Sequence, residues 1–112
     1  MSVLNITTDN FKSEVINSSK PVLVDFWAAW CGPCSRMSGI IEEISNEITP
    51  EIKVGKINVD EQPELARQFN IISIPTFAVF KNGNIVTSTV GTADKSELLN
   101  MLNINWKILE KE

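Results

Sequence analysis

Hydrophobic and polar residues are arranged along the chain in blocks that predict strands and helices in turn. The six residues from Val22 to Trp27 are apolar at every position but one, which is typical of a strand covered on both faces. After Cys34 the apolar residues recur at helical spacing instead, and these are Met37, Ile40, Ile41, Ile44 and Ile48. We therefore expect a buried strand followed closely by a helix with one apolar face.

Four further segments have the pattern of strands, and they span residues 3–6, 53–59, 76–80 and 85–90. The last two are joined through Asn82 and Gly83, and Asn-Gly is the strongest short-range signal for a hairpin turn. The sequence therefore predicts an antiparallel pair of strands near its carboxyl end.

Two more helices are predicted between these strands. The first carries Phe11 and Val15 four residues apart, and either Thr8 or Asp9 can cap it. The second is short, follows Gln62-Pro63 and is marked by Leu65, Ala66 and Phe69. Both have apolar residues at a spacing that places them on one helical face.

The last predicted helix begins at the acidic pair Asp94 and Glu97, whose spacing favours a capping box, and its apolar residues are Leu98, Leu99, Leu102 and Trp106. The complete order is β-α-β-α-β-α-β-β-α. This order predicts an α/β fold in which a mixed central sheet has helices on both faces. At 112 residues, we expect one domain that spans residues 1–112.

Composition narrows the possible functions. A net charge of −4 argues against nucleic-acid partners, because binding to phosphates needs clustered Lys and Arg. The first residues lack the basic and apolar regions of a signal peptide, and no stretch approaches the length of a membrane helix. We therefore expect a soluble cytoplasmic protein, monomeric and without a membrane partner.

The two cysteines of the chain lie between the buried strand and the helix, in the sequence Cys31-Gly32-Pro33-Cys34. This spacing places the sulfur atoms about one helical turn apart, which is near enough for a disulfide. Unpaired N–H groups at a helix start stabilise a thiolate, and Pro33 is compatible with the first helical turn. The pair therefore indicates thiol–disulfide chemistry.

Half of a zinc site is the alternative interpretation of the cysteine pair. Zinc usually takes about four ligands from Cys, His or acidic residues, and this chain has no histidine and no third cysteine. Such a site would need carboxylates or a second subunit, so we expect no metal.

Asp25 is unusual because it places a carboxylate inside the apolar strand. Burial would raise its pKa toward the range in which a carboxyl group exchanges protons with a thiol, which suits a general acid or base. A solvated position at the strand end is the alternative. Lys56 lies in the next predicted strand and could be solvated in the same way.

The segment Trp30-Cys31-Gly32-Pro33-Cys34 resembles the active site of the thioredoxin family. The likeness extends over nearly the whole chain and includes Asp25, Lys56, Ile74-Pro75-Thr76, Lys81-Asn82-Gly83 and Gly91. It implies the thioredoxin fold and a protein-disulfide reductase with a redox-active Cys31–Cys34 disulfide and no bound cofactor. It also implies disulfide-containing protein substrates and regeneration by thioredoxin reductase, through which NADPH acts indirectly.

The resemblance also implies roles for individual residues. Cys31, partly exposed, would attack the substrate, and Cys34, shielded, would resolve the mixed disulfide with help from Asp25, which Lys56 would tune. The Ile74–Pro75 bond would be cis and face the cysteines. A flat apolar surface would bind substrates through Trp30, Gly32, Pro33, Ile74, Pro75 and Gly91, while Trp27 would stay in the core.

Four positions depart from the pattern of the family: Ala29, Ser35, Gly39 and Ser73. The family often has an acidic residue at position 29, a lysine at 35, a proline at 39 and a glycine at 73. None of the four replacements removes a group that the chemistry needs. Two other functions remain open, namely a redox-independent binding subunit of a larger assembly and a disulfide oxidase or isomerase.

Overall fold

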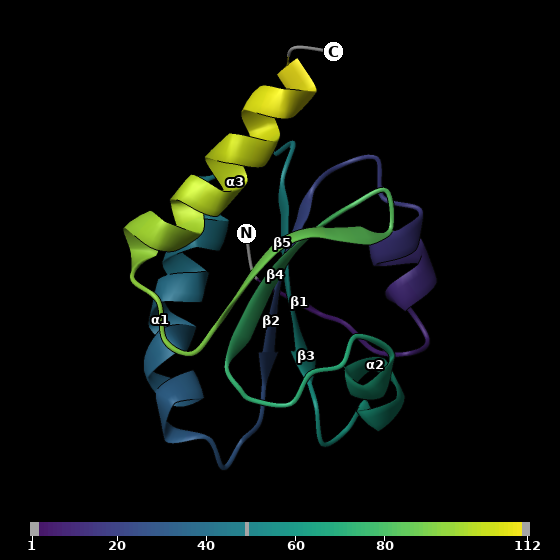
Figure 1. Cartoon of the computed structure of the whole chain (residues 1–112), viewed down its shortest axis with the longest axis vertical. Helices are drawn as coiled ribbons and strands as arrows, with labels where there is room; N and C mark the ends of the chain where they lie inside the picture. The colour runs from purple at the N-terminus through teal and green to yellow at the C-terminus, as the bar shows by residue number, and fades with distance from the viewer. Residues whose placement is uncertain (1–2, 49, 111–112) are drawn as a thin grey trace.

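Five strands form one mixed sheet in the order β1-β3-β2-β4-β5 (Figure 1). In this computed structural model the backbone is described for residues 3–48 and 50–110, and side chains are described as far as residue 102. The strands are β1 (Leu4–Asn5), β2 (Val22–Trp27), β3 (Lys53–Asn58), β4 (Thr76–Lys81) and β5 (Asn84–Val90). β3 runs parallel to β1 and β2, whereas β4 runs antiparallel to β2 and β5, so the predicted mixed sheet is confirmed.

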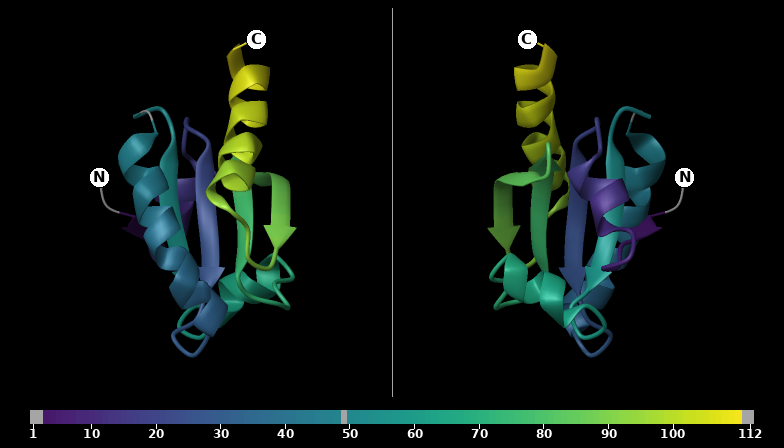
Figure 2. Two further views of the ribbon diagram at one scale, coloured as in Figure 1. Left: turned by 90° about the vertical axis from the view of Figure 1, so that its left-hand side faces the viewer. Right: turned by 90° about the vertical axis from the view of Figure 1, so that its right-hand side faces the viewer.

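Helices cover both faces of this sheet (Figures 1 and 2). One face carries α1 (Gly32–Glu47) and α3 (Lys95–Glu110), and the other carries η1 (Lys12–Ile16) and α2 (Pro63–Gln68). Within the described part of the chain, no helix is long and apolar enough to cross a membrane. The α/β class and the element order are as the sequence predicts.

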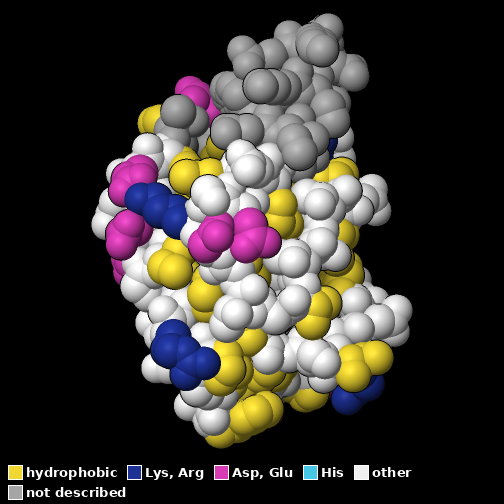
Figure 3. Space-filling model, turned by 60° about the vertical axis from the view of Figure 1, so that its left-hand side comes forward, with side chains coloured by type: hydrophobic (Ala, Val, Ile, Leu, Met, Phe, Trp, Pro, Cys, Tyr) yellow, Lys and Arg dark blue, Asp and Glu magenta, His cyan; other side chains and the backbone are white. Residues whose placement is uncertain are grey.

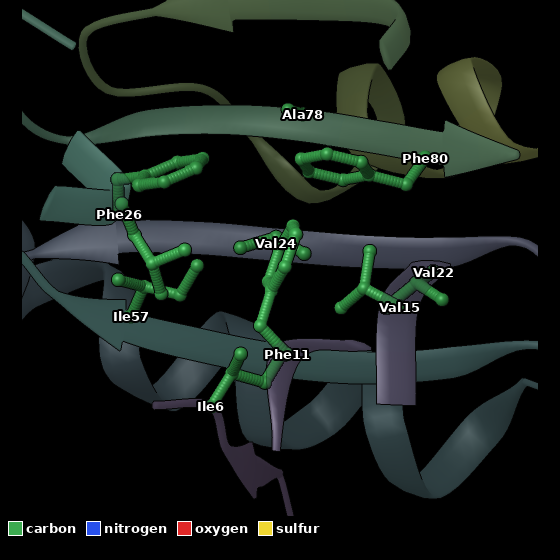
Figure 4. Close-up of a cluster of buried hydrophobic side chains, with 10 residues drawn as sticks. Ile6, Phe11, Val15, Val22, Val24, Phe26, Ile57, Ala78 and Phe80 are labelled. Atoms are coloured by element: carbon green, nitrogen blue, oxygen red, sulfur yellow. The ribbon is translucent and has the colours of Figure 1, made fainter. Parts of the chain in front are cut away.

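β2 is the central strand, and its side chains alternate between the two faces of the sheet. Val22, Val24 and Phe26 enter the cluster beneath η1 and α2 (Figure 4). Leu23 enters the opposite cluster, beneath α1 and α3. By the same alternation Asp25 lies on the α1 face, which brings a carboxyl group under the helix that carries the cysteines.

Two local structures, a hairpin turn and a helix cap, form as the sequence predicts. Asn82 and Gly83 both have positive φ angles, of 54° and 79°, as a tight hairpin turn between β4 and β5 requires. At the start of α3, the Glu97 N–H donates to the Asp94 carboxylate and the Asp94 N–H donates to the Glu97 carboxylate, at 2.9 and 3.1 Å. The predicted capping box is therefore confirmed. The side chain of Trp106 lies outside the described residues.

The first helix differs from its prediction. η1 is a single π-helical turn, in which the Asn17 N–H donates to the Lys12 carbonyl oxygen at 2.8 Å. Neither Thr8 nor Asp9 caps it, because the turn begins later, with Phe11 at the cap position and no side-chain cap. The buried side chains of Phe11 and Val15 hold this short turn against the sheet, so packing takes the place of capping.

Two glycines give opposite predictions for substitution by alanine. A Cβ atom on Gly55 would overlap Ile6 Cδ1 and lie 3.3 Å from the Leu4 carbonyl oxygen, whereas one on Gly39 would meet no atom within 4 Å. We expect Gly55→Ala to lower the free energy of unfolding by about 1 to 3 kcal/mol through overpacking. We expect Gly39→Ala to raise it by up to about 1 kcal/mol through helix propensity. Urea unfolding of the two variants measures both changes, and equal effects would contradict this packing.

Candidate active site

The cysteines lie where the central strand passes into a helix. β2 ends at Trp27, and Cys31 is the cap residue of α1, with φ −87° and ψ 107°. Cys31 and Cys34 form a disulfide with their Cα atoms 5.2 Å apart, and the Cys34 N–H donates to Cys31 Sγ at 3.2 Å. A sulfur that accepts this bond at the positive end of a helix dipole is stabilised as a thiolate once the disulfide is reduced.

The expected contrast in exposure between the two cysteines is wrong for the disulfide form. Cys31 is 4% exposed and Cys34 is 3% exposed, so both are buried. The reason is that both sulfurs pack in one small cluster with Ala28, against Trp27 and Ile74. The two cysteines differ instead in their position on α1, because Cys31 precedes the first turn and Cys34 lies within it.

The segment before β4 faces the disulfide. The Ile74–Pro75 peptide bond is cis, as the family resemblance implies, and the Ile74 carbonyl oxygen lies 3.9 Å from Cys31 Sγ. The Gly91 N–H donates to the Pro75 carbonyl oxygen at 2.8 Å, which brings Gly91 to the same end of the sheet. Residues from three distant parts of the sequence therefore meet at the cysteine pair.

Trp30 extends this region to the surface, with 71% of the residue exposed. Its indole N–H donates to a carboxylate oxygen of Asp60 at 2.7 Å, and the Asn58 side-chain oxygen accepts bonds from the N–H groups of Asp60 and Glu61. Gly32 is exposed and Pro33 is half-buried beside it. Figure 3 shows hydrophobic side chains gathered at the end of the molecule where β2 passes into α1.

Asp60 was missed by sequence reasoning. It lies 30 residues from its partner Trp30, in a turn after β3 that carries no functional motif. The sequence carries no local signal for this bond, because only the fold brings Asp60 and Trp30 together.

Asp25 is buried, with 4% exposure, so the alternative of a solvated strand end is wrong. β2 and β3 are in parallel register with Asp25 beside Lys56, which places both side chains on the α1 face. Burial raises the pKa of Asp25 to about 7, and the positive charge of Lys56 opposes this rise. Such a carboxyl group exchanges its proton near neutral pH.

Lys56 and Trp27 complete the surroundings of this acid. The Lys56 ammonium nitrogen lies 5.2 Å from the centre of the Trp27 ring, within the range of a cation–π interaction. Trp27 is only partly buried, so its expected place in the core is partly wrong. It packs against the small cluster of Ala28 and the two cysteines and belongs to neither of the two large hydrophobic clusters.

A cavity of about 330 Å³ opens beside Asp25, between α1 and the sheet. Its lining includes Cys34, Lys56 and Trp27, together with three of the four positions that depart from the family pattern, Ala29, Ser35 and Gly39. Among the described residues, no group of three or more His, Cys, Asp or Glu side chains could hold a metal ion.

A disulfide-forming cysteine pair at a helix start, beyond the carboxyl end of a central strand, defines a thiol–disulfide oxidoreductase. The family model "Thioredoxin" matches residues 2–104. A thioredoxin from Pyropia yezoensis is 50% identical over 103 residues, which cover 92% of this chain and 96% of that protein. A thioredoxin from Rickettsia felis is 48% identical over 99 residues, covering 88% of this chain and 94% of that protein. The chain belongs to the thioredoxin family, and it is a protein-disulfide reductase with a redox-active cysteine pair.

The raised pKa of Asp25 predicts a pH-dependent cost of folding. The carboxyl group has a pKa near its ordinary value of 3.8 when unfolded and about 7 when folded, so the folded state binds more protons between these values. The folded state is therefore most stable below the unfolded pKa of 3.8. Its stability falls as the pH rises through the folded pKa of about 7.

We expect Asp25→Asn, which cannot ionise, to be more stable than the wild type at pH 8 by up to about 4 kcal/mol. The difference should vanish near pH 4, where both side chains are neutral. Urea unfolding of the oxidised proteins at the two pH values measures it. Equal stability at pH 8 would show that the carboxylate is not buried.

Proposed function

We propose that Cys31 is the nucleophile and Cys34 the resolving thiol of this reductase. The observation that carries the proposal is the hydrogen bond from the Cys34 N–H to Cys31 Sγ at the start of α1. This bond and the helix dipole favour the thiolate form of Cys31 over that of Cys34. Cys31 therefore attacks a substrate disulfide to give a mixed disulfide, and Cys34 then displaces the reduced substrate.

Asp25 accepts the proton of Cys34 in the second step, and Lys56 tunes the acid by favouring its ionised form. Support comes from the burial of Asp25, the shared cavity lining of Asp25 and Cys34, and the position of Lys56 on the neighbouring strand. A base whose pKa lies near 7 is suited to both accept and return a proton at neutral pH.

Substrates bind across an apolar surface around the disulfide, formed by Trp30, Gly32, Pro33, Ile74, Pro75 and Gly91. The Ile74 carbonyl oxygen beside Cys31 supports pairing with an extended substrate segment. Main-chain pairing depends little on the side chains of the substrate, so the surface suits many protein disulfides.

The family supports a redox cycle in which thioredoxin reductase restores the dithiol with electrons from NADPH. In this proposal the chain binds no cofactor itself and acts as a cytoplasmic monomer formed by one domain over residues 1–112. Its partners are the reductase and disulfide-containing proteins, with no nucleic acid or membrane involved.

Serine substitutions separate the roles of the two cysteines. Cys34→Ser keeps the nucleophile but removes the resolving thiol, so it should accumulate a mixed disulfide with a protein substrate. Cys31→Ser should form no such adduct and should lose turnover. Non-reducing electrophoresis and an NADPH-coupled disulfide-reduction assay measure the two outcomes. Turnover retained in Cys31→Ser would contradict the assignment of the nucleophile.

A further inference from the structure

Strand β5 forms an outer edge of the sheet. It is the last strand in the order β1-β3-β2-β4-β5, so within the described part of the chain no strand pairs with its outer side (Figure 2). Natural proteins usually protect such an edge with charged residues, a proline or a very short strand. β5 is seven residues long and contains no charged residue and no proline. Its outer side is therefore free to pair with another extended segment.

The ladder between β4 and β5 defines which backbone groups face outward. The Gly91 N–H donates to the Pro75 carbonyl oxygen at 2.8 Å, one position beyond the paired residues Thr76 and Val90. Bonded and non-bonded pairs alternate in an antiparallel ladder, so Val90 and Ser88 direct their N–H and carbonyl groups away from β4. A register shift at the other end of the pair confines the regular ladder to this half of β5.

A cavity of about 250 Å³ lies beside this edge. Its lining includes Ala78 and Ser88, which pair across β4 and β5, and Ala78 belongs to the hydrophobic cluster on the η1 and α2 face. The segment 69–73, which follows α2, forms one wall. Of the described residues that line the cavity, none is charged. Sites for drug-sized ligands occupy roughly 300 to 1,000 Å³, so this smaller cavity suits one or two side chains.

Exposed apolar residues gather around the cavity. The described chain has six exposed large hydrophobic residues, and three of them, Ile72, Ile85 and Val90, line it. Ile72 is the most exposed of the six, at 93%. Apolar side chains that gather at one place on a surface mark an interaction site, whereas isolated ones are ordinary. The free edge and the cavity beside it therefore form one candidate binding site.

We propose that an extended segment of a disulfide-containing substrate adds to β5 as a further strand and places an aliphatic side chain in this cavity. Backbone bonds to Ser88 and Val90 hold the segment, and the uncharged cavity selects the side chain. Ser88 is small, so a side chain from the added strand can reach across it. The inference rests on the proposed substrate surface and adds to it a second contact, with a preference for aliphatic residues.

The site is continuous with the proposed substrate surface. Ser73 and Thr76 line the cavity, and the Ile74–Pro75 segment between them faces the disulfide. β5 itself ends beside Gly91, whose N–H bonds to the Pro75 carbonyl oxygen. A protein bound over the disulfide can therefore extend one of its segments along β5.

A second copy of the chain is the other candidate for this edge. In a two-fold pairing centred on Ser88, each copy would place another serine opposite this residue. The cavity would then stay unfilled. A substrate segment with an aliphatic residue at that position fills it, so the geometry favours the substrate.

Strand addition can be tested without catalysis. The probe is a synthetic peptide of about eight residues, built from threonine and serine with one leucine and no cysteine, which can slide until the leucine meets the cavity. It is titrated into the oxidised, isotope-labelled protein and followed by NMR. We expect the N–H groups of Ser88 and Val90 to become protected from hydrogen exchange. A peptide with aspartate in place of leucine should bind at least about tenfold more weakly.

Two variants separate the backbone contact from the cavity contact. Ser88→Pro removes an outward N–H that makes no bond to β4, a position at which an edge strand tolerates proline. Ile72→Asp places a charge on the cavity wall. Each should raise the dissociation constant of the leucine peptide at least about fivefold, whereas the matched controls Ser88→Thr and Ile72→Leu should stay within about twofold of the wild type.

The result with the unchanged protein decides the proposal, whether or not the variants fold. Absence of protection at Ser88 and Val90 would overturn it, and equal binding of the leucine and aspartate peptides would overturn the role of the cavity. Protection that grows with protein concentration in the absence of peptide would reassign the edge to a second copy. Reduction of a small aromatic disulfide by the same samples tests the reductase separately, so normal reduction without peptide binding would reject only the added strand.

Discussion

The burial of β2 on both faces is the constraint on which the rest of the structure depends. One face of the strand needs the cover of η1 and α2, and the other needs α1 and α3. Strand alternation then places Asp25 beneath α1, and the end of the strand at Trp27 sets the start of α1 at the cysteine pair. One strand therefore places both the acid and the disulfide of the reductase.

The burial of Asp25 lowers the stability of the folded protein and also raises the pKa of this acid. A buried carboxylate beside a single lysine opposes folding at neutral pH, whereas an apolar residue at position 25 would pack without that cost. The same burial holds the pKa of Asp25 near 7, where the acid can exchange protons with a thiol. The cavity of about 330 Å³ beside Asp25 lowers the packing density around this acid.

The sequence predicts most of what depends on local patterns. The buried strand β2, the Asn82-Gly83 turn and the capping box of α3 are all set by residues close together in the chain, and each is confirmed. The π-helical form of η1 was not predicted, because packing of two buried side chains decides it. The bond between Asp60 and Trp30 and the cavity beside Asp25 depend on contacts between distant segments and on side-chain volume, for which a single sequence carries no signal.

The central claim is that the Cys31–Cys34 pair acts as a reductant of protein disulfides. Its reduction potential tests this most directly, and it can be measured by equilibrating the protein in glutathione buffers while following tryptophan fluorescence. The account predicts that the Cys31–Cys34 dithiol is at least as strong a reductant as cytosolic glutathione. Its midpoint potential should lie at or below about −220 mV, the upper end of the cytosolic glutathione range. A midpoint near about −120 mV, the range of strong disulfide oxidants, would contradict it.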